Sequence, residues 1–182
     1  MGRTRTAALD GARRVLAEHG VRKATMGDVA VRGGLAKATL YNHFRTKDDL
    51  VAGLVHDEVT DLAADCVDLA GDDLAVALTR AADGIATHPV LVGLRTVEPG
   101  ALVSLAAPTT APGWDLVRAQ VALVLDAAGR SSDPEHVDYV CRWLASHVPE
   151  PGTPDSRAQQ ARLLAATLPA AVRTTTFATP TP

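Results

Sequence analysis

Apolar residues recur every three or four positions along almost the whole chain, the period of an α-helix with one buried face. One such stripe lies in residues 6–19 and is followed by Gly20, a residue type that commonly ends a helix. A longer stripe in residues 47–70 joins Val51, Val55, Val59, Leu62, Cys66 and Leu69. The alternating pattern of a β-strand is not sustained anywhere. The sequence therefore predicts an all-α fold.

Helix ends are marked by capping residues and breakers. Thr25 is an N-cap for a short helix over 26–32, which Gly33-Gly34 ends, and Thr46 is an N-cap for the long helix, with Asp48 and Asp49 in its first turn. Pro and Gly divide the rest of the chain. The other helices are expected near 37–44, 73–87, 114–129, 133–147 and 153–168, with two short ones and a loop within 89–113.

Charge divides the chain unequally. Residues 1–56 hold ten Lys and Arg against five Asp and Glu, whereas residues 57–182 hold eight against sixteen. A basic first third indicates a module that faces nucleic acid, attached to a part that does not, although chance clustering of surface charge is the alternative. We expect a DNA-binding domain over 1–50, a helical domain over 51–170 and a disordered tail over 171–182, which has little apolar content.

Several protein classes are disfavoured by the composition. Cys66 and Cys141 are far apart and belong to no Cys/His cluster, so neither a disulfide framework nor a metal site is expected. No apolar run is long enough to span a membrane, and the N-terminus does not resemble a signal peptide, so a cytoplasmic location is expected. The nucleophile, phosphate-binding and zinc-protease motifs are missing, so we expect no enzyme, catalytic residue or cofactor.

Residues 25–44 have the form of a helix-turn-helix, two short helices joined by a tight turn. Ala30 supplies the small residue that the helix crossing needs, and Gly34 can adopt the positive φ of the turn. Val29, Leu35 and Leu40 are spaced to fill the core between the helices. The second helix would then expose Lys37, Thr39, Tyr41, Asn42 and His43, whose polar groups suit phosphates and base edges.

Residues 5–55 resemble the DNA-binding domain of the TetR-type bacterial transcriptional repressors. The resemblance rests on the segments Ala17-Glu18-His19-Gly20, Thr25-Met26-Gly27-Asp28-Val29-Ala30 and, above all, Ala38-Thr39-Leu40-Tyr41-Asn42-His43-Phe44-Arg45-Thr46-Lys47-Asp48-Asp49-Leu50. Two positions depart from the family pattern. Ala36 stands where Ser is common, and Gly27 stands where several relatives carry a longer side chain.

The resemblance implies a role for each matching position. Thr25, Tyr41, His43 and Lys47 would bind phosphates, Lys37 and Thr39 would meet bases or phosphates, and Asn42 would read a base. Phe44 and Leu40 are expected in the core, and Tyr41 has packing as an alternative role. Arg3 and Arg5, placed before the first helix, could reach the DNA backbone or a minor groove.

The rest of the chain agrees with the effector-binding and dimerisation domain of that family. The dimer interface is expected on residues 133–147 and 155–168, although the aromatic flank of the first of these helices could instead pack within its own subunit. Candidate ligand-binding residues are Cys66, His88, Arg95, Trp114 and Trp143. Because aromatic residues are few, a small, apolar effector is favoured over a flat polycyclic cation.

We therefore interpret the chain as a sequence-specific, homodimeric transcriptional regulator. It would act as a repressor that a small-molecule effector releases from a palindromic double-stranded DNA operator. In this interpretation the effector shifts the long helix and changes the separation of the two recognition helices. The alternative is a helical protein-interaction or ligand-binding module without specific DNA binding, which leaves the basic motif unexplained.

Overall fold

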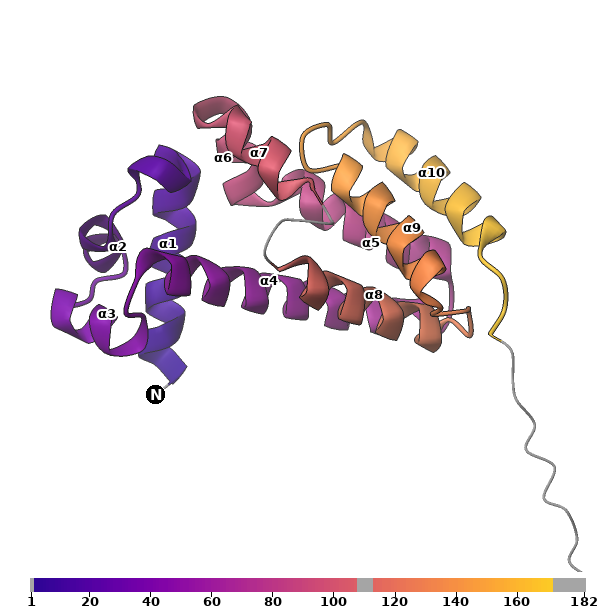
Figure 1. The fold of residues 1–182 in the computed structure, drawn as a ribbon, viewed down its shortest axis with the longest axis horizontal. Helices are drawn as coiled ribbons and strands as arrows, with labels where there is room; N and C mark the ends of the chain where they lie inside the picture. Colours follow the sequence, from indigo (N-terminus) through magenta and orange to yellow (C-terminus); the bar gives the residue numbers. More distant parts are fainter. Residues whose placement is uncertain (1, 108–112, 172–182) are drawn as a thin grey trace, which may run out of the picture.

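The computed structural model describes residues 2–107 and 113–171, and within these ranges the regular structure is entirely helical apart from an isolated bridge between Arg130 and Ala170 (Figure 1). The predicted all-α fold is confirmed. The helices are α1 (Gly2–Lys23), α2 (Met26–Arg32), α3 (Lys37–His43), α4 (Lys47–Ala70), α5 (Leu74–Thr87), α6 (Pro89–Val97), α7 (Pro99–Leu105), α8 (Trp114–Ala127), α9 (Pro134–Ser146) and α10 (Pro154–Thr167). The predicted tail lies outside the described residues, except for 171.

The first helix differs from its prediction at both ends. It begins at Gly2, so Arg3 and Arg5 lie on the helix and do not precede it. Gly20 breaks the helical geometry as expected, with φ 77° and ψ 173°, but one more turn follows as far as Lys23. A Cβ at Gly20 would also lie against the Glu98 carboxylate, which accepts a hydrogen bond from the Arg22 amide.

The helix caps of the motif follow the sequence closely. Thr25 Oγ1 accepts a hydrogen bond from the Asp28 amide, and Thr46 forms a reciprocal capping box with Asp49. Gly34 has φ 63°, the left-handed conformation that the turn requires. Ala36 precedes α3 without a side-chain cap, as its missing hydroxyl dictates.

Two hydrophobic cores lie along the molecule, and α4 belongs to both. The first gathers α1, α2, α3 and the start of α4, and it also takes in Leu94 of α6 and Leu102 of α7. The second joins the later part of α4 with α5, α8, α9 and α10. Figure 1 shows α4 running from the helix-turn-helix end of the molecule to the bundle. Displacement of α4 therefore affects both cores.

Helix α6 packs closely against α1 within the first core. Gly93 lies so near the α1 backbone that an added Cβ would stand 2.1 Å from the Ala17 carbonyl oxygen. Only a residue without a side chain permits this separation. Helix α6 is therefore seated directly on the first helix of the chain.

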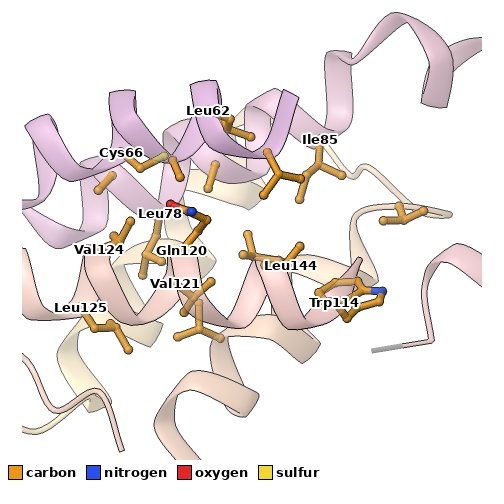
Figure 2. Close-up of a pocket in the computed structure, with 17 residues that line it drawn as sticks. Leu62, Cys66, Leu78, Ile85, Trp114, Gln120, Val121, Val124, Leu125 and Leu144 are labelled. Atoms are coloured by element: carbon orange, nitrogen blue, oxygen red, sulfur yellow. The ribbon is translucent and has the colours of Figure 1, made fainter. Parts of the chain in front are cut away.

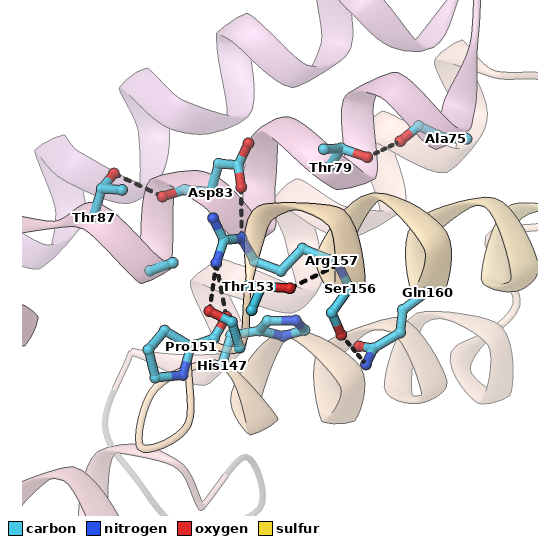
Figure 3. A network of polar contacts seen from close by, with 12 residues as sticks. Ala75, Thr79, Asp83, Thr87, His147, Pro151, Thr153, Ser156, Arg157 and Gln160 are labelled. Atoms are coloured by element: carbon cyan, nitrogen blue, oxygen red, sulfur yellow. Dashed lines mark hydrogen bonds and ion pairs between the residues drawn. The ribbon is translucent and has the colours of Figure 1, made fainter.

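A buried arginine holds the last helix in place (Figure 3). The Arg157 side chain is 7% exposed; it pairs with Asp83 of α5 and donates to the carbonyls of Pro151 and Gly152 before α10. A buried guanidinium needs such partners because desolvation of an unpaired charge is costly. The arginine thus joins α10 and the preceding loop to α5.

Candidate functional site

Helix α3 is anchored by its apolar side and presents its polar side to solvent. Leu40 is 0% exposed, and Phe44, which follows the helix, is also buried. Lys37, Tyr41 and Asn42 are exposed, whereas Thr39 and His43 are half-buried. This arrangement is suited to insertion of the exposed face into a DNA groove.

The N-terminal end of α2 lies beside the start of α3. A Cβ on Gly27 would be 3.6 Å from Thr25 Oγ1 and 4.0 Å from Lys37 Nζ, so these groups lie close together. The Thr25 hydroxyl is engaged with its own helix, since it donates to Asp28 Oδ2 over 2.6 Å. The Lys37 ammonium therefore adds positive charge at the N-terminal end of α2, where the helix dipole is also positive.

The structure gives Lys47 a partner that the sequence did not indicate. Its Nζ donates to the carbonyl oxygens of Val21 at 2.8 Å and Ala24 at 3.2 Å. The ammonium thereby ties the start of α4 to the end of α1. Similarly, Arg5 forms a two-pronged ion pair with Asp57 of α4, and its guanidinium lies 5.9 Å from the centre of the Phe44 ring.

Two neighbouring cavities lie in the described part of the chain, the first within the second core and the second extending to the first core. The first, of about 190 Å³, lies among α4, α5, α8 and α9 (Figure 2). Its lining is aliphatic apart from Trp114, Cys66 and the carboxamide-bearing Gln120. The second, of about 230 Å³, extends to α1 and α6 and includes Glu58 and His88. Both are lined by Val59, Leu62, Ile85, Trp114, Val117 and Val148.

Three of the five predicted ligand-binding residues meet at these cavities. Cys66 lines the first, His88 lines the second, and Trp114 lines both. The other two lie elsewhere. Arg95 donates to the carbonyls of Ala86, His147 and Val148, and Trp143 donates to Gln160 on α10.

Glu58 was not predicted and lies at the centre of a polar cluster. Its carboxylate accepts a hydrogen bond from Arg13 Nε of α1 at 2.7 Å. His88 Nε2 lies 3.3 Å from the other carboxylate oxygen, and neither ring nitrogen has a hydrogen-bond partner of good geometry among the described residues. Burial lowers the pKa of His88, against the opposing effect of the Glu58 carboxylate, and thus favours the neutral imidazole.

Both cysteines are expected to resist alkylation in the folded protein. Burial raises the pKa of Cys66 and of Cys141 to about 11, because the thiolate is poorly solvated inside the bundle. At pH 8 the thiolate, the reactive form, is then about one part in a thousand. Labelling with iodoacetamide should be more than about a hundredfold slower than in the urea-unfolded chain. Equal rates would contradict the burial.

Other kinds of site find no support in the described part of the chain. There, no group of His, Cys, Asp and Glu is arranged to hold a metal ion. None of the described helices combines the length and hydropathy that crossing a bilayer requires.

Comparison with known proteins identifies the N-terminal module. Residues 8–54 match the family model of bacterial regulatory proteins, tetR family. Residues 8–54 thus form an N-terminal domain of the tetR family type. A 56-residue segment is 39% identical to the HTH-type transcriptional repressor Rv1474c of Mycobacterium tuberculosis. That segment covers 31% of this chain and only 30% of the repressor.

Over most of its length the chain has the same fold as solved regulators. It is similar to the TetR family repressor AlkX from Dietzia sp. strain DQ12-45-1b, with a TM-score of 0.66 and 18% identity over 89% of this chain and 93% of that one. It is also similar to the fatty acid degradation regulator FadR from Bacillus halodurans, with a TM-score of 0.63 and 15% identity over 91% and 96%. These likenesses establish a shared architecture.

Proposed function

We propose that the protein is a homodimeric, sequence-specific transcriptional repressor that a small-molecule effector releases from its DNA operator. The observation that carries the proposal is α3, which buries Leu40 completely and exposes Lys37 and Asn42 at the tip of a tetR-family domain. The similar repressor of M. tuberculosis supports the direction of regulation.

Dimerisation is supported by apolar surface on the outer helices. In α9, the stripe of Val140, Cys141 and Leu144 is buried within its own subunit, but Tyr139 on another face is 57% exposed. Leu163 of α10 is 63% exposed. We propose that these faces of α9 and α10 meet their counterparts about a two-fold axis, which would present two copies of α3 to two half-sites.

Release by an effector is supported by the position of the second cavity. Leu91 and Leu94 of α6 line it from one side, and Leu16 of α1 lines it from another. Because Gly93 seats α6 against α1, a ligand that moves α6 would also move the DNA-binding domain. If the two copies of α3 in the dimer are displaced in this way, they can no longer enter successive major grooves of the operator at the same time.

The salt dependence of DNA binding tests this function against its alternative. For the protein and a duplex of random sequence, we expect the logarithm of the association constant to fall steeply and linearly with the logarithm of salt concentration, as phosphate contacts release counterions. Fluorescence anisotropy of a labelled duplex gives the slope. A helical interaction module without DNA binding would give no binding at low salt.

Replacing Lys47 by alanine should weaken binding to all DNA sequences alike and flatten the log–log salt slope by about one unit, as loss of one phosphate contact requires. It should also lower the melting temperature, because the bonds to the Val21 and Ala24 carbonyls are lost. If the salt slope is unchanged and only the melting temperature falls, Lys47 stabilises the fold and does not contact a phosphate.

Replacing Asn42 by alanine should change which sequence is bound more than how tightly DNA in general is held. Its exposed carboxamide can donate and accept, which suits a bidentate contact with adenine worth ~1–3 kcal/mol. Affinities for a selected operator and its single-base variants, with melting curves alongside, measure the effect. Equal losses on every sequence would make Asn42 a backbone contact, and a much lower melting temperature would make it structural.

A further inference from the structure

We propose that the two cavities form one binding site for an uncharged, elongated ligand: a hydrocarbon chain that carries a single hydrogen-bonding group, such as a hydroxyl or an ester. The ligand's role as effector rests on the proposed function, but its binding to the protein does not require DNA. The chemistry of the described lining residues and the extent of the cavities carry the inference.

The described lining residues offer no counter-charge for an anionic ligand. Among the described lining residues Glu58 is the sole member with an ordinarily charged side chain, and neither cavity is lined by a Lys or Arg. The guanidinium of Arg13, beside the lining residue Glu58, already pairs with Glu58 and Asp10. That of Arg80, near the lining residue Gly84, pairs with Asp65. A ligand carboxylate would therefore be desolvated without a partner and would lie near another carboxylate, which is costly.

A cationic ligand is also poorly matched. Glu58, which could attract it, is committed to Arg13. Sites for quaternary ammonium groups are built from several aromatic faces, and here Trp114 is the one tryptophan, tyrosine or phenylalanine among the described lining residues. The indole N–H is also occupied, because it donates to the Leu105 carbonyl over 2.8 Å.

The shape of the site is elongated. At one end the first cavity reaches Leu125 in the second core (Figure 2). At the other end the second cavity reaches Leu16 of α1. The six shared residues lie where the two meet. An aliphatic chain is complementary to this lining along its length, since each buried methylene contributes about 0.8 kcal/mol.

The polar group of the ligand would lie at the His88 end. A neutral imidazole has one donor and one acceptor, and both nitrogens of His88 are shielded from water, with no hydrogen-bond partner among the described residues. Such unpaired buried groups destabilise the free protein. A hydroxyl or ester at this end would supply the missing hydrogen bond.

Three probes of equal chain length test the charge preference on the full chain without DNA: 1-decanol, decanoate and decyltrimethylammonium. We expect 1-decanol to raise the melting temperature and to bind at least about tenfold more tightly than either ion by calorimetry, because an unpaired buried charge is costly. Equal or tighter binding of decanoate or the cation, or no binding of 1-decanol, would overturn the proposal.

Two variants and a chain-length series locate the site. His88→Phe should weaken 1-decanol binding roughly three- to tenfold through loss of one hydrogen bond. Val117→Phe, where the two cavities meet, should weaken binding more than about tenfold because the larger side chain fills the space. If Val117→Phe does not fold, the affinities of the wild-type protein for 1-hexanol, 1-octanol and 1-decanol test the elongated site instead. It should rise about three- to fourfold per methylene, and no rise would overturn the elongated site.

Measurements of 1-decanol binding and of DNA binding distinguish failure of the proposed ligand class from failure of the proposed function. Salt-dependent DNA binding without 1-decanol binding would reject the ligand class and leave the regulator intact. Tight 1-decanol binding by a chain that does not bind DNA would reject the regulator and leave the ligand class intact.

Discussion

Replacing Gly93 by alanine is expected to lower the melting temperature by about 5–10 °C, which corresponds to ~2–3 kcal/mol for a chain of this size. The new methyl group would lie 2.1 Å from the Ala17 carbonyl oxygen, well inside van der Waals contact, and the obstacle is backbone that cannot rotate away. Helix α6 must therefore move off α1. Because α6 also lines the second cavity, ligand binding and DNA affinity should change with it.

Gly100→Ala is the matched control for this substitution. Gly100 lies in α7, and nothing stands within 4 Å of the position of its Cβ. Alanine there should stabilise the helix by ~0.5–1 kcal/mol, because glycine loses more conformational freedom on folding. Thermal melts of both variants should thus shift in opposite directions. A Gly93→Ala variant as stable as the wild type would show that α6 is not held against α1 as the structure indicates.

Replacing Leu40 by alanine is expected to cost ~3–4 kcal/mol and to abolish specific DNA binding. Leu40 is 0% exposed and is the residue through which α3 enters the first core. Its truncation removes apolar contacts and leaves a cavity that the surrounding helices fill only in part. Helix α3 would then lose its fixed orientation relative to α2. Denaturant unfolding and operator binding measure the two effects.

Val31→Ala serves as the control for Leu40→Ala. Val31 belongs to the same motif but its side chain is 79% exposed, so truncation there should change stability by no more than ~0.5 kcal/mol. If the two variants had similar stability, α3 would not be anchored through Leu40.

Much of the fold could be predicted from the sequence because local signals and packing agree in it. Thr25, Thr46 and the Pro residues mark helix starts, and Gly34 meets the one requirement of the tight turn. The period of apolar residues then identifies the buried faces, including Leu40. Such consistency between local preference and tertiary structure is what makes a sequence interpretable.

The candidate site was less predictable because it depends on contacts between distant segments. Glu58 looked like any other acidic residue of a long helix, yet it is placed between Arg13, 45 positions earlier, and His88. Arg95 looked available to a ligand, but its guanidinium is used by three carbonyl groups. The number of hydrogen bonds that a side chain has already made cannot be read from sequence spacing.

The role of Gly93 shows the same limit for packing. A glycine within an apolar helical stretch has no local signal that separates a close helix contact from a neutral position such as Gly100. The difference arises only when α6 is docked on α1, and that docking joins residues more than seventy positions apart.

Selection of bound sequences from a pool of random duplex DNA by the full-length protein tests the central claim most directly. A dimer that presents two copies of α3 should enrich an inverted repeat whose half-sites are centred about one helical turn or somewhat more apart. Recovery of that repeat would establish symmetric, sequence-specific recognition. Enrichment of sequences without two-fold symmetry, or no enrichment over the starting pool, would contradict it.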